Sequence, residues 1–230
     1  MLPIAILAGG LATRLRPITD KIPKALVEIN GEPFISHQLR LLESRGLRRV
    51  VLCLGYRGEM VRDFVGDGKA FGLAVEYSFD GPVLRGTAGA IHQALSLLEE
   101  AFFVLYGDSY LTCDYQAVEE AFRAAGKTGL MTVFQNEGQW DSSNVEFAGG
   151  RISAYDKKNR TPRMHHIDYG LGVFHRSAFA GMTADEVADL TALYQGLLAR
   201  GELSAFLVKE RFYEIGSPAG IRELSEALRN

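Results

Sequence analysis

The chain has 230 residues, of which 47% are hydrophobic and 23% charged, and this composition excludes an intrinsically disordered protein. Its formal net charge of −3 argues against a protein that binds nucleic acid or anionic membranes through a broad basic surface. No apolar run approaches the roughly 18 residues of a membrane-spanning helix, and the apolar residues 2–8 lack the basic start of a signal peptide. Cys53 and Cys113 lie far apart and suit free thiols in a reducing cytoplasm.

The first 135 residues alternate short apolar runs with amphipathic stretches. This alternation predicts strand-helix-strand units and a Rossmann-like α/β fold, with a mixed, mainly parallel sheet flanked by helices. The predicted strands cover residues 3–8, 49–54, 74–78, 102–106 and 129–134. The predicted helices cover residues 34–46, 57–66, 87–99 and 114–125. Gly46 and Gly126 stand where the first and the last of these helices should end.

After residue 135 the segments become shorter and more β-like. Residues 143–147 and 151–155, joined by Gly149-Gly150, predict a hairpin within a β-rich insertion. The remaining predicted elements are a strand at 171–175, a helix at 189–200, strands at 204–208 and 211–215, and a last helix at 217–228. No repeat or linker interrupts the chain, so we expect a single domain over residues 1–230.

The strongest motif follows the first predicted strand directly and reads Leu7-Ala8-Gly9-Gly10-Leu11-Ala12-Thr13-Arg14-Leu15-Arg16-Pro17. Small residues let backbone N–H groups approach an anion, and the Thr13 hydroxyl and the Arg14 guanidinium add donors for phosphate oxygens. Pro23 stiffens the backbone before Lys24, whose ammonium can act as a point charge on a reacting phosphate. A Gly-Gly turn alone would also close a strand-helix junction, but the added donors favour a triphosphate site.

Two other glycine-rich phosphate sites are disfavoured. The chain contains no G-x-G-x-x-G, which argues against a dinucleotide oxidoreductase. Gly126-Lys127-Thr128 lacks the preceding glycine of a Walker loop.

Asp108 is a candidate metal ligand. It follows the apolar run 102–105, and therefore should lie at the carboxyl end of a central strand, where α/β sheets bind ligands. A lone Asp at such a position is more often a turn or helix cap, but a metal site is favoured in a chain that also carries the glycine-rich loop and Pro23-Lys24, and the family resemblance described next supports it further.

Together these segments resemble the sugar-1-phosphate nucleotidyltransferase family, whose motif is a glycine-rich loop, then Thr-Arg-Leu-x-Pro, then Pro-Lys-x-Leu, here Pro23-Lys24-Ala25-Leu26. One departure is Ala12, where many members have glycine. The resemblance spans nearly the whole chain. It implies that the chain joins a nucleoside triphosphate to a sugar 1-phosphate and releases pyrophosphate, with Mg²⁺ as cofactor. It also implies a nucleotide-binding part over residues 1–135 and a sugar-binding and C-terminal part over 136–230.

The resemblance implies a set of nucleotide-binding residues in two segments. Residues 86–91 open a predicted helix with small residues, which lets a flat base lie against the backbone. Thr87 has an alternative role as an ordinary helix N-cap. The full implied set is Leu7, Ala8, Gly9, Gly10, Thr13, Arg14, Gly86, Thr87, Ala88 and Gly89.

A second metal ligand is implied near the end of the chain. Glu214 precedes Ile215-Gly216-Ser217-Pro218, a turn before which the family usually has Asp. Because Glu is one methylene longer, its carboxylate would reach Mg²⁺ with altered geometry or through water.

The sugar-binding residues implied by the resemblance are Asn144, Asp156, Asp168 and Tyr169. Lys157 corresponds to a lysine that faces the sugar phosphate, although Lys158 next to it leaves the register open. A solvated loop is the alternative for this charged run, which also contains Arg160. The adjacent His165 and His166 have no Cys or carboxylate spacing that would indicate zinc.

Catalysis in such a family rests on charge neutralisation, and Arg14, Lys24 and Lys157 are the expected catalytic residues. The motifs look closest to guanylyltransferases that act on D-glycero-D-manno-heptose 1-phosphate or mannose 1-phosphate, while uridylyl- and cytidylyltransferases stay open. A metal-dependent glycosyltransferase is a rival, but it generally carries Asp-x-Asp, whereas Ser109 and Tyr110 follow Asp108. A non-catalytic nucleotide-sugar sensor is the other rival. The oligomeric state cannot be read from the sequence.

Overall fold

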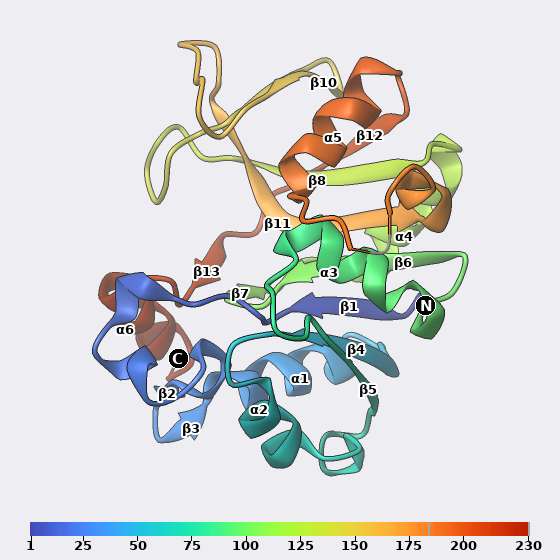
Figure 1. Cartoon of the computed structure of the whole chain (residues 1–230). Helices are drawn as coiled ribbons and strands as arrows, with labels where there is room; N and C mark the ends of the chain where they lie inside the picture. The colour runs from blue at the N-terminus through green and yellow to red at the C-terminus, as the bar shows by residue number, and fades with distance from the viewer. Residues whose placement is uncertain (184, 230) are drawn as a thin grey trace.

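A mixed sheet forms the centre of the molecule (Figure 1). The structure is a computed structural model that describes residues 1–183 and 185–229. Among these residues the sheet has nine strands in the order β10-β9-β11-β6-β1-β4-β5, with β8 paired to β11 and β12 paired to β8. The strands are β1 (Ile4–Leu7), β4 (Arg49–Leu54), β5 (Ala74–Phe79), β6 (Ala101–Tyr106), β8 (Gly129–Gln135), β9 (Val145–Ala148), β10 (Arg151–Tyr155), β11 (His166–His175) and β12 (Leu203–Val208).

The strand directions agree with the fold predicted from the sequence. β6, β1, β4 and β5 are parallel neighbours, as strand-helix-strand units require. β11 then runs antiparallel to β6, to β8 and to β9, and introduces the mixed part of the sheet. The predicted α/β class is therefore confirmed.

Helices cover both faces of the sheet. α1 (Phe34–Ser44), α2 (Gly58–Val65) and α4 (Tyr115–Ala125) pack on one face, and α3 (Gly86–Ala94) and α5 (Leu190–Ala199) on the other. Side chains alternate along a strand, so Ile4 and Ile6 of β1 join the first core while Ala5 joins the second. This two-sided burial explains why the strands read as continuous apolar runs.

β11 differs most from its prediction. The expected strand covers residues 171–175, whereas the observed strand begins at His166. Its pairing with β8 is irregular between Asp168 and Gly172, and Gly170 has a φ of +100°. The bulge lets polar side chains occur inside a strand that crosses the sheet, a pattern that apolar periodicity does not detect.

The C-terminal end returns to the N-terminal loops. β13 (Phe212–Glu214) pairs with β7 (Ser109–Leu111), and α6 (Pro218–Ala227) packs beside the small hairpin of β2 (Glu28–Ile29) and β3 (Glu32–Pro33). The register places Glu214 opposite Ser109. Two segments more than a hundred residues apart therefore lie together beside Asp108, as the red β13 and the green β7 of Figure 1 illustrate. Among the described residues, no helix is both long and apolar enough to cross a membrane.

Candidate active site

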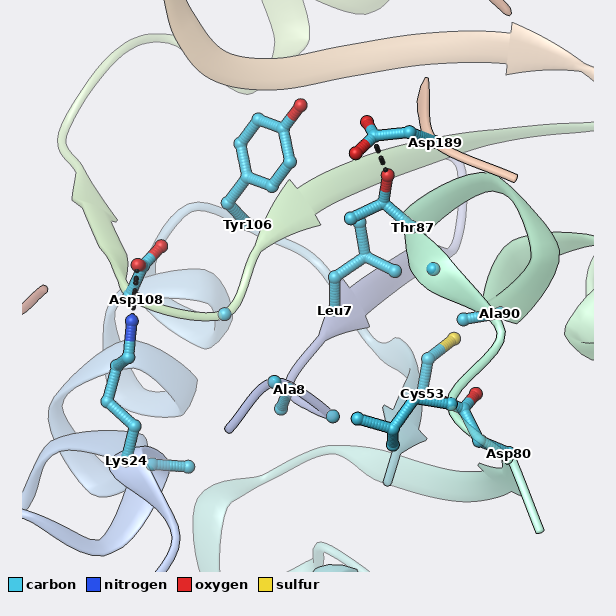
Figure 2. Close-up of a pocket in the computed structure, with 16 residues that line it drawn as sticks. Leu7, Ala8, Lys24, Cys53, Asp80, Thr87, Ala90, Tyr106, Asp108 and Asp189 are labelled. Carbon is cyan, nitrogen blue, oxygen red and sulfur yellow. Dashed lines mark hydrogen bonds and ion pairs between the residues drawn. The ribbon is translucent and has the colours of Figure 1, made fainter. Parts of the chain in front are cut away.

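A cavity of about 280 Å³ lies at the carboxyl ends of β1, β4 and β6 (Figure 2). This is the edge at which parallel α/β sheets bind ligands. Its lining combines the predicted loop residues with polar groups from other strands: Leu7, Ala8, Gly9, Gly10, Lys24, Ala25, Cys53, Asp80, Leu84, Gly86, Thr87, Ala90, Tyr106, Gly107, Asp108 and Asp189. We call it the nucleotide-side cavity.

The glycine-rich loop approaches the end of β4 closely. The Gly9 carbonyl accepts a hydrogen bond from the Tyr56 amide at 3.1 Å, and a Cβ on Gly9 would lie 2.9 Å from the Gly55 nitrogen. Glycine is therefore required at this position. Ala12, the departure from the family motif, has a φ of +49°, in the left-handed region that favours glycine.

Lys24 and Asp108 form an ion pair at one end of this cavity, with 2.7 Å between Nζ and Oδ2. Lys24 begins a short 3₁₀ helix directly after Pro23, and Asp108 follows β6. Both side chains remain accessible, at 20% and 28% of their surface. The pair places a positively charged and a negatively charged side chain next to each other at this end of the cavity.

The start of α3 is held by a segment from the C-terminal part. The Ala188 carbonyl accepts hydrogen bonds from the amides of Ala88 and Gly89, at 2.9 and 3.3 Å. The Thr87 hydroxyl donates to the Asp189 carboxylate at 3.0 Å and accepts from the Leu190 amide at 2.7 Å. Gly86 and Thr87 line the nucleotide-side cavity, whereas Ala88 and Gly89 lie outside its lining, against residues 186–188.

Asp189 keeps its charge in this partly buried position. Burial opposes ionisation, but hydrogen bonds from Thr191 and from the Thr87 hydroxyl outweigh it and lower the pKa of the Asp189 carboxyl below its usual value. The same carboxylate accepts the Thr191 amide at 3.0 Å and so caps α5. One residue thus supports both the helix and the cavity wall.

Cys53 and Asp80 lie at the opposite end of the cavity from Lys24 and Asp108 (Figure 2). The Asp80 residue is only 6% exposed, and its Oδ2 accepts the Arg85 amide at 3.3 Å. Burial raises the pKa of the Asp80 carboxyl, although Arg85 opposes the shift. Burial, together with the charge of Asp80, raises the pKa of the Cys53 thiol to about 12, so this thiol is a neutral wall group.

A second cavity of about 440 Å³ adjoins the first, and both are lined by Tyr106 and Asp108. We call it the sugar-side cavity. Its other lining residues come from the N-terminal loop, β7, the β8–β9 loop, the β10–β11 loop, β11 and β13: Arg14, Ser109, Asp141, Ser142, Asn144, Lys157, Arg160, Ile167, Asp168, Tyr169, Gly170, Phe212 and Glu214.

Asp168 is the centre of a hydrogen-bond network in this cavity. Its side chain is 2% exposed, and Oδ2 accepts the hydroxyls of Tyr155 and Tyr106 at 3.1 and 3.4 Å. The Asn144 side chain accepts the Asp168 amide at 3.0 Å. Burial and then the nearby Asp168 charge raise the pKa of Tyr106 well above its usual value, so the Tyr106 hydroxyl stays a proton donor.

Lys157 and Lys158 have different surroundings, and these show which of the two side chains points into the sugar-side cavity. The Lys157 ammonium lies 3.6 Å from Asp168 Oδ2, 3.3 Å from the Tyr106 hydroxyl and 4.9 Å from the centre of the Tyr106 ring. Lys158 is absent from the lining of the sugar-side cavity. Lys157 therefore faces the cavity.

Three further predicted residues do not have the surroundings expected of them, although one of them, Tyr169, does line the sugar-side cavity. The Asp156 carboxylate accepts the amides of Lys158 and Asn159, which lower the pKa of its carboxyl and close the loop. Asp156 and Thr13 are absent from the lining of both cavities. The Tyr169 ring packs between Phe134 and Phe212, and the residue is only 2% exposed. Their sugar or nucleotide contacts stay predictions.

Glu214 and Arg14 lie side by side at the edge of the sugar-side cavity. The Glu214 carboxylate accepts the Gly216 amide, and at 3.0 Å the Ser217 hydroxyl. A Cβ on Gly216 would overlap the Glu214 carboxylate and lie 3.1 Å from the Arg14 guanidinium. The turn thus orients Glu214, and the predicted Arg14 lies on the sugar side of Asp108.

The sequence did not single out several of the residues that line the two cavities, among them Tyr106, Asp80 and Asp189. For two of them a signal existed: Tyr106 and Asp80 follow or end predicted strands at the carboxyl edge of the sheet, as Asp108 does. No such sequence signal marked Asp189. It reaches the cavity through its contact with Thr87, which lies 102 residues earlier in the chain.

Comparison with known proteins gives a consistent result. A family model described as nucleotidyl transferase matches residues 4–229. The N-acetylmuramate alpha-1-phosphate uridylyltransferase of Neisseria meningitidis serogroup B is 28% identical over 224 residues, covering 95% of this chain and 94% of that protein. The mannose-1-phosphate guanyltransferase of Neurospora crassa is 30% identical over 222 residues, covering 93% of this chain but 60% of that protein.

A solved structure shares the fold. HddC from Yersinia pseudotuberculosis, in complex with GMP-PN, has a TM-score of 0.82 and 24% identity, covering 99% of this chain and 100% of that chain. The expected enzyme class, a nucleotidyltransferase, is confirmed by the match over residues 4–229. The protein belongs to the nucleotidyl transferase family.

Proposed function

We propose that the chain transfers a nucleotidyl group from a nucleoside triphosphate to a sugar 1-phosphate and releases pyrophosphate. The observation that carries this proposal is the meeting of two cavities at Tyr106 and Asp108. One cavity has the glycine-rich loop and Lys24, and the other has Lys157 and the Asp168 network. Two phosphorylated ligands bound in these cavities would have their phosphates next to each other.

The residues at this junction suit charge neutralisation. Backbone amides of the Gly9–Gly10 loop and the Lys24 ammonium would bind the triphosphate, and Lys157 with Arg14 would bind the sugar phosphate. An oxygen of the sugar phosphate forms a bond to the α-phosphorus while the bond from that phosphorus to pyrophosphate breaks in line. The attacking oxygen is already anionic, so no general base is needed.

The donors at the junction fit a divalent cation. Asp108 and Glu214 both line the sugar-side cavity, and the Ile215 amide donates to the Asp108 carbonyl at 2.9 Å, which ties the two segments together. Among the described residues no group of three or more His, Cys, Asp or Glu side chains could hold a metal. Mg²⁺ usually takes one or two carboxylates and completes its octahedron with phosphate oxygens and water. Asp108 and Glu214 would hold it, and it would neutralise phosphate charge.

For the substrates we propose GTP and a heptose or mannose 1-phosphate. The guanyltransferase relative supports a guanine nucleotide and a mannose 1-phosphate, whereas the uridylyltransferase relative keeps UTP and another sugar phosphate as the alternative. CTP is the remaining candidate. The buried Asp168, with Asn144 beside it, supports recognition of sugar hydroxyls by hydrogen bonding, since buried polar groups discriminate strongly between substrates.

The organisation and location of the chain are proposed on the same basis. One sheet contains strands from residues 1–135 and from 136–229, which supports a single catalytic domain. Residues from each part line both cavities. Cys53 and Cys113 are both buried free thiols, which supports a reducing, cytoplasmic location.

The test is a matrix of GTP, UTP, CTP, ATP and dTTP against sugar 1-phosphates, with Mg²⁺ and coupled detection of pyrophosphate. We expect one nucleotide and one sugar phosphate to give the highest kcat/KM, and chelation of Mg²⁺ to abolish the signal. If nucleotides bind but no pair releases pyrophosphate, the chain is a sensor and the proposal fails. Transfer from an NDP-sugar to an acceptor without pyrophosphate would indicate a glycosyltransferase.

A further inference from the structure

The loop between β10 and β11, residues 156–165, carries two cations of the sugar-side cavity, Lys157 and Arg160. It contains no helix or strand, so the hydrogen bonds of regular structure do not fix its position. The Lys157 side chain is 41% exposed, so burial does not fix it either. Contacts from neighbouring elements must therefore keep these two cations at the cavity.

Glu146 of β9 holds the far end of this loop. Its Oε1 accepts the Thr161 hydroxyl at 2.5 Å, and its Oε2 accepts the Arg163 guanidinium at 3.2 Å. The loop is closed on itself at this point, because the Arg163 amide donates to the Thr161 hydroxyl at 3.3 Å and the Met164 amide donates to the Thr161 carbonyl at 3.1 Å. One carboxylate thus fastens a closed turn of the loop to a strand of the central sheet.

Glu146 is a buried carboxylate that lies outside both cavities. Its side chain is 10% exposed, and it is absent from the lining of either cavity. Hydrogen bonds from Thr161 and then from Arg163 lower the pKa of the Glu146 carboxyl below its usual value, so it is charged at neutral pH. The Ser153 hydroxyl, at the irregularity in the pairing of β9 with β10, donates to the same carboxylate at 3.4 Å. A buried charge is costly without such donors, and here they come from the hairpin and from the loop, so the charge ties the two together.

We propose that Glu146 is a positioning residue for the sugar phosphate, which holds the loop so that the Lys157 ammonium stays in the sugar-side cavity. The inference rests on the proposed function of that cavity. The Lys157 ammonium lies 3.6 Å from Asp168 Oδ2 and 4.9 Å from the centre of the Tyr106 ring. A lysine has a long flexible stem, and its charge is effective on a phosphate only where the surrounding structure holds it in place. Glu146 would touch no substrate and would act through Lys157.

The test is a double-substitution cycle of Glu146→Ala and Lys157→Ala, measured as kcat and KM for each substrate by pyrophosphate release. We expect Glu146→Ala to raise KM for the sugar phosphate about 10-fold and to change KM for the nucleotide less than about 2-fold, because only the sugar-side loop is displaced. In the Lys157→Ala background the same substitution should have no further effect on KM, since the two residues act as a unit. Glu146→Gln keeps an acceptor for the Thr161 hydroxyl and should recover most of the wild-type KM.

Glu202→Ala is the matched control. The Glu202 carboxylate also accepts a threonine hydroxyl, that of Thr128 at 2.7 Å, but it lines neither cavity. Its loss should leave both KM values within about 2-fold of the wild type. If Glu146→Ala does not fold, Thr161→Val takes its place, because it removes the donor on the loop side of the same contact. A folded variant with a wild-type KM for the sugar phosphate overturns the inference, and so does an equal effect with and without Lys157.

A second measurement does not depend on turnover. In NMR spectra of the chain with ¹³C-labelled lysine, the ε-methylene protons of Lys157, assigned by their absence in Lys157→Ala, should be shifted by the Tyr106 ring below the ammonium. Glu146→Ala should move this resonance towards that of an exposed lysine, whereas Glu202→Ala should not. An unchanged resonance in Glu146→Ala contradicts the inference. A displaced resonance in a chain that releases pyrophosphate from no substrate pair would refute the proposed function and leave the positioning of Lys157 by Glu146 standing.

Discussion

The two cavities differ in how they are built. The nucleotide-side cavity is walled mostly by backbone and small residues at the ends of parallel strands, such as Gly9, Gly10 and Gly107. The sugar-side cavity is walled by longer polar side chains, and Asp168 is positioned there by Tyr106, Tyr155 and Asn144. The backbone thus determines the shape of the nucleotide-side cavity, whereas hydrogen bonds between side chains determine the shape of the sugar-side cavity. Substitutions at their junction should affect both, and substitutions in one cavity should affect one substrate.

The largest effect is expected at the junction, for Lys24→Ala. This substitution removes the ammonium that lies 2.7 Å from Asp108 and leaves the Asp108 carboxylate without its ion-pair partner. We expect kcat to fall at least ~100-fold, the scale of losing one preorganised electrostatic group. Asp108→Ala should cost a similar factor. Steady-state pyrophosphate release is the measurement.

Lys21→Ala is the control for that experiment, because Lys21 is exposed, lies three residues away and lines neither cavity. It should keep the wild-type rate within about 2-fold, in line with a surface substitution. A folded Lys24→Ala variant with near-wild-type kcat would show that the ion pair is only structural.

An intermediate effect, confined to one substrate, is expected for Lys157→Ala. The Lys157 ammonium lies between Asp168 and the Tyr106 ring in the sugar-side cavity, so its loss should raise KM for the sugar phosphate about 10- to 100-fold. The affinity for the nucleotide should change little. Lys158→Ala, with the same charge change one residue away, should leave both parameters within about 2-fold. Equal effects of the two substitutions would contradict the orientation of this loop and the division between the cavities.

The difference between the cavities also explains what the sequence could predict. Leu7 to Gly10 and Lys24, which line one cavity, could be singled out because they belong to contiguous motifs of the kind that phosphate-binding loops have. The strands could be predicted because burial on both faces gives continuous apolar runs. Asp168 and Tyr169 were both candidates for the sugar. Both line the sugar-side cavity, but the Asp168 carboxylate is the centre of its hydrogen-bond network, whereas the Tyr169 ring packs mainly into the core.

Other parts of the site could not be predicted, for a physical reason. The network of Asp168 depends on the bulge in β11 and on Tyr155 and Tyr106 arriving from two other strands, so no local pattern specifies it. Gly86 to Gly89 were predicted to bind the nucleotide because they are small, but the lack of a side chain at Gly86 and Gly89 also permits the close approach of residues 186–188. A run of small residues in the sequence indicates that another group approaches the backbone closely, but it does not indicate whether that group is a ligand or another segment of the chain.

The smallest effect is expected where the C-terminal part closes the nucleotide-side cavity, for Thr87→Val. Valine has the same shape but cannot accept the Leu190 amide or donate to Asp189, so a partly buried donor loses its partner. We expect a loss of about 1–2 kcal/mol in the free energy of unfolding, equivalent to a fall of about 2–8 °C in Tm for a chain of this size. Thr87→Ser keeps the hydroxyl and should lie within about 0.5 kcal/mol of the wild type. KM for the nucleotide should rise in Thr87→Val while KM for the sugar phosphate stays constant, because Asp189 lines only the first cavity. If Thr87→Val and Thr87→Ser melt at the same temperature, the hydroxyl bridge does not hold the segment, and packing of Gly86 and Gly89 against residues 186–188 must suffice.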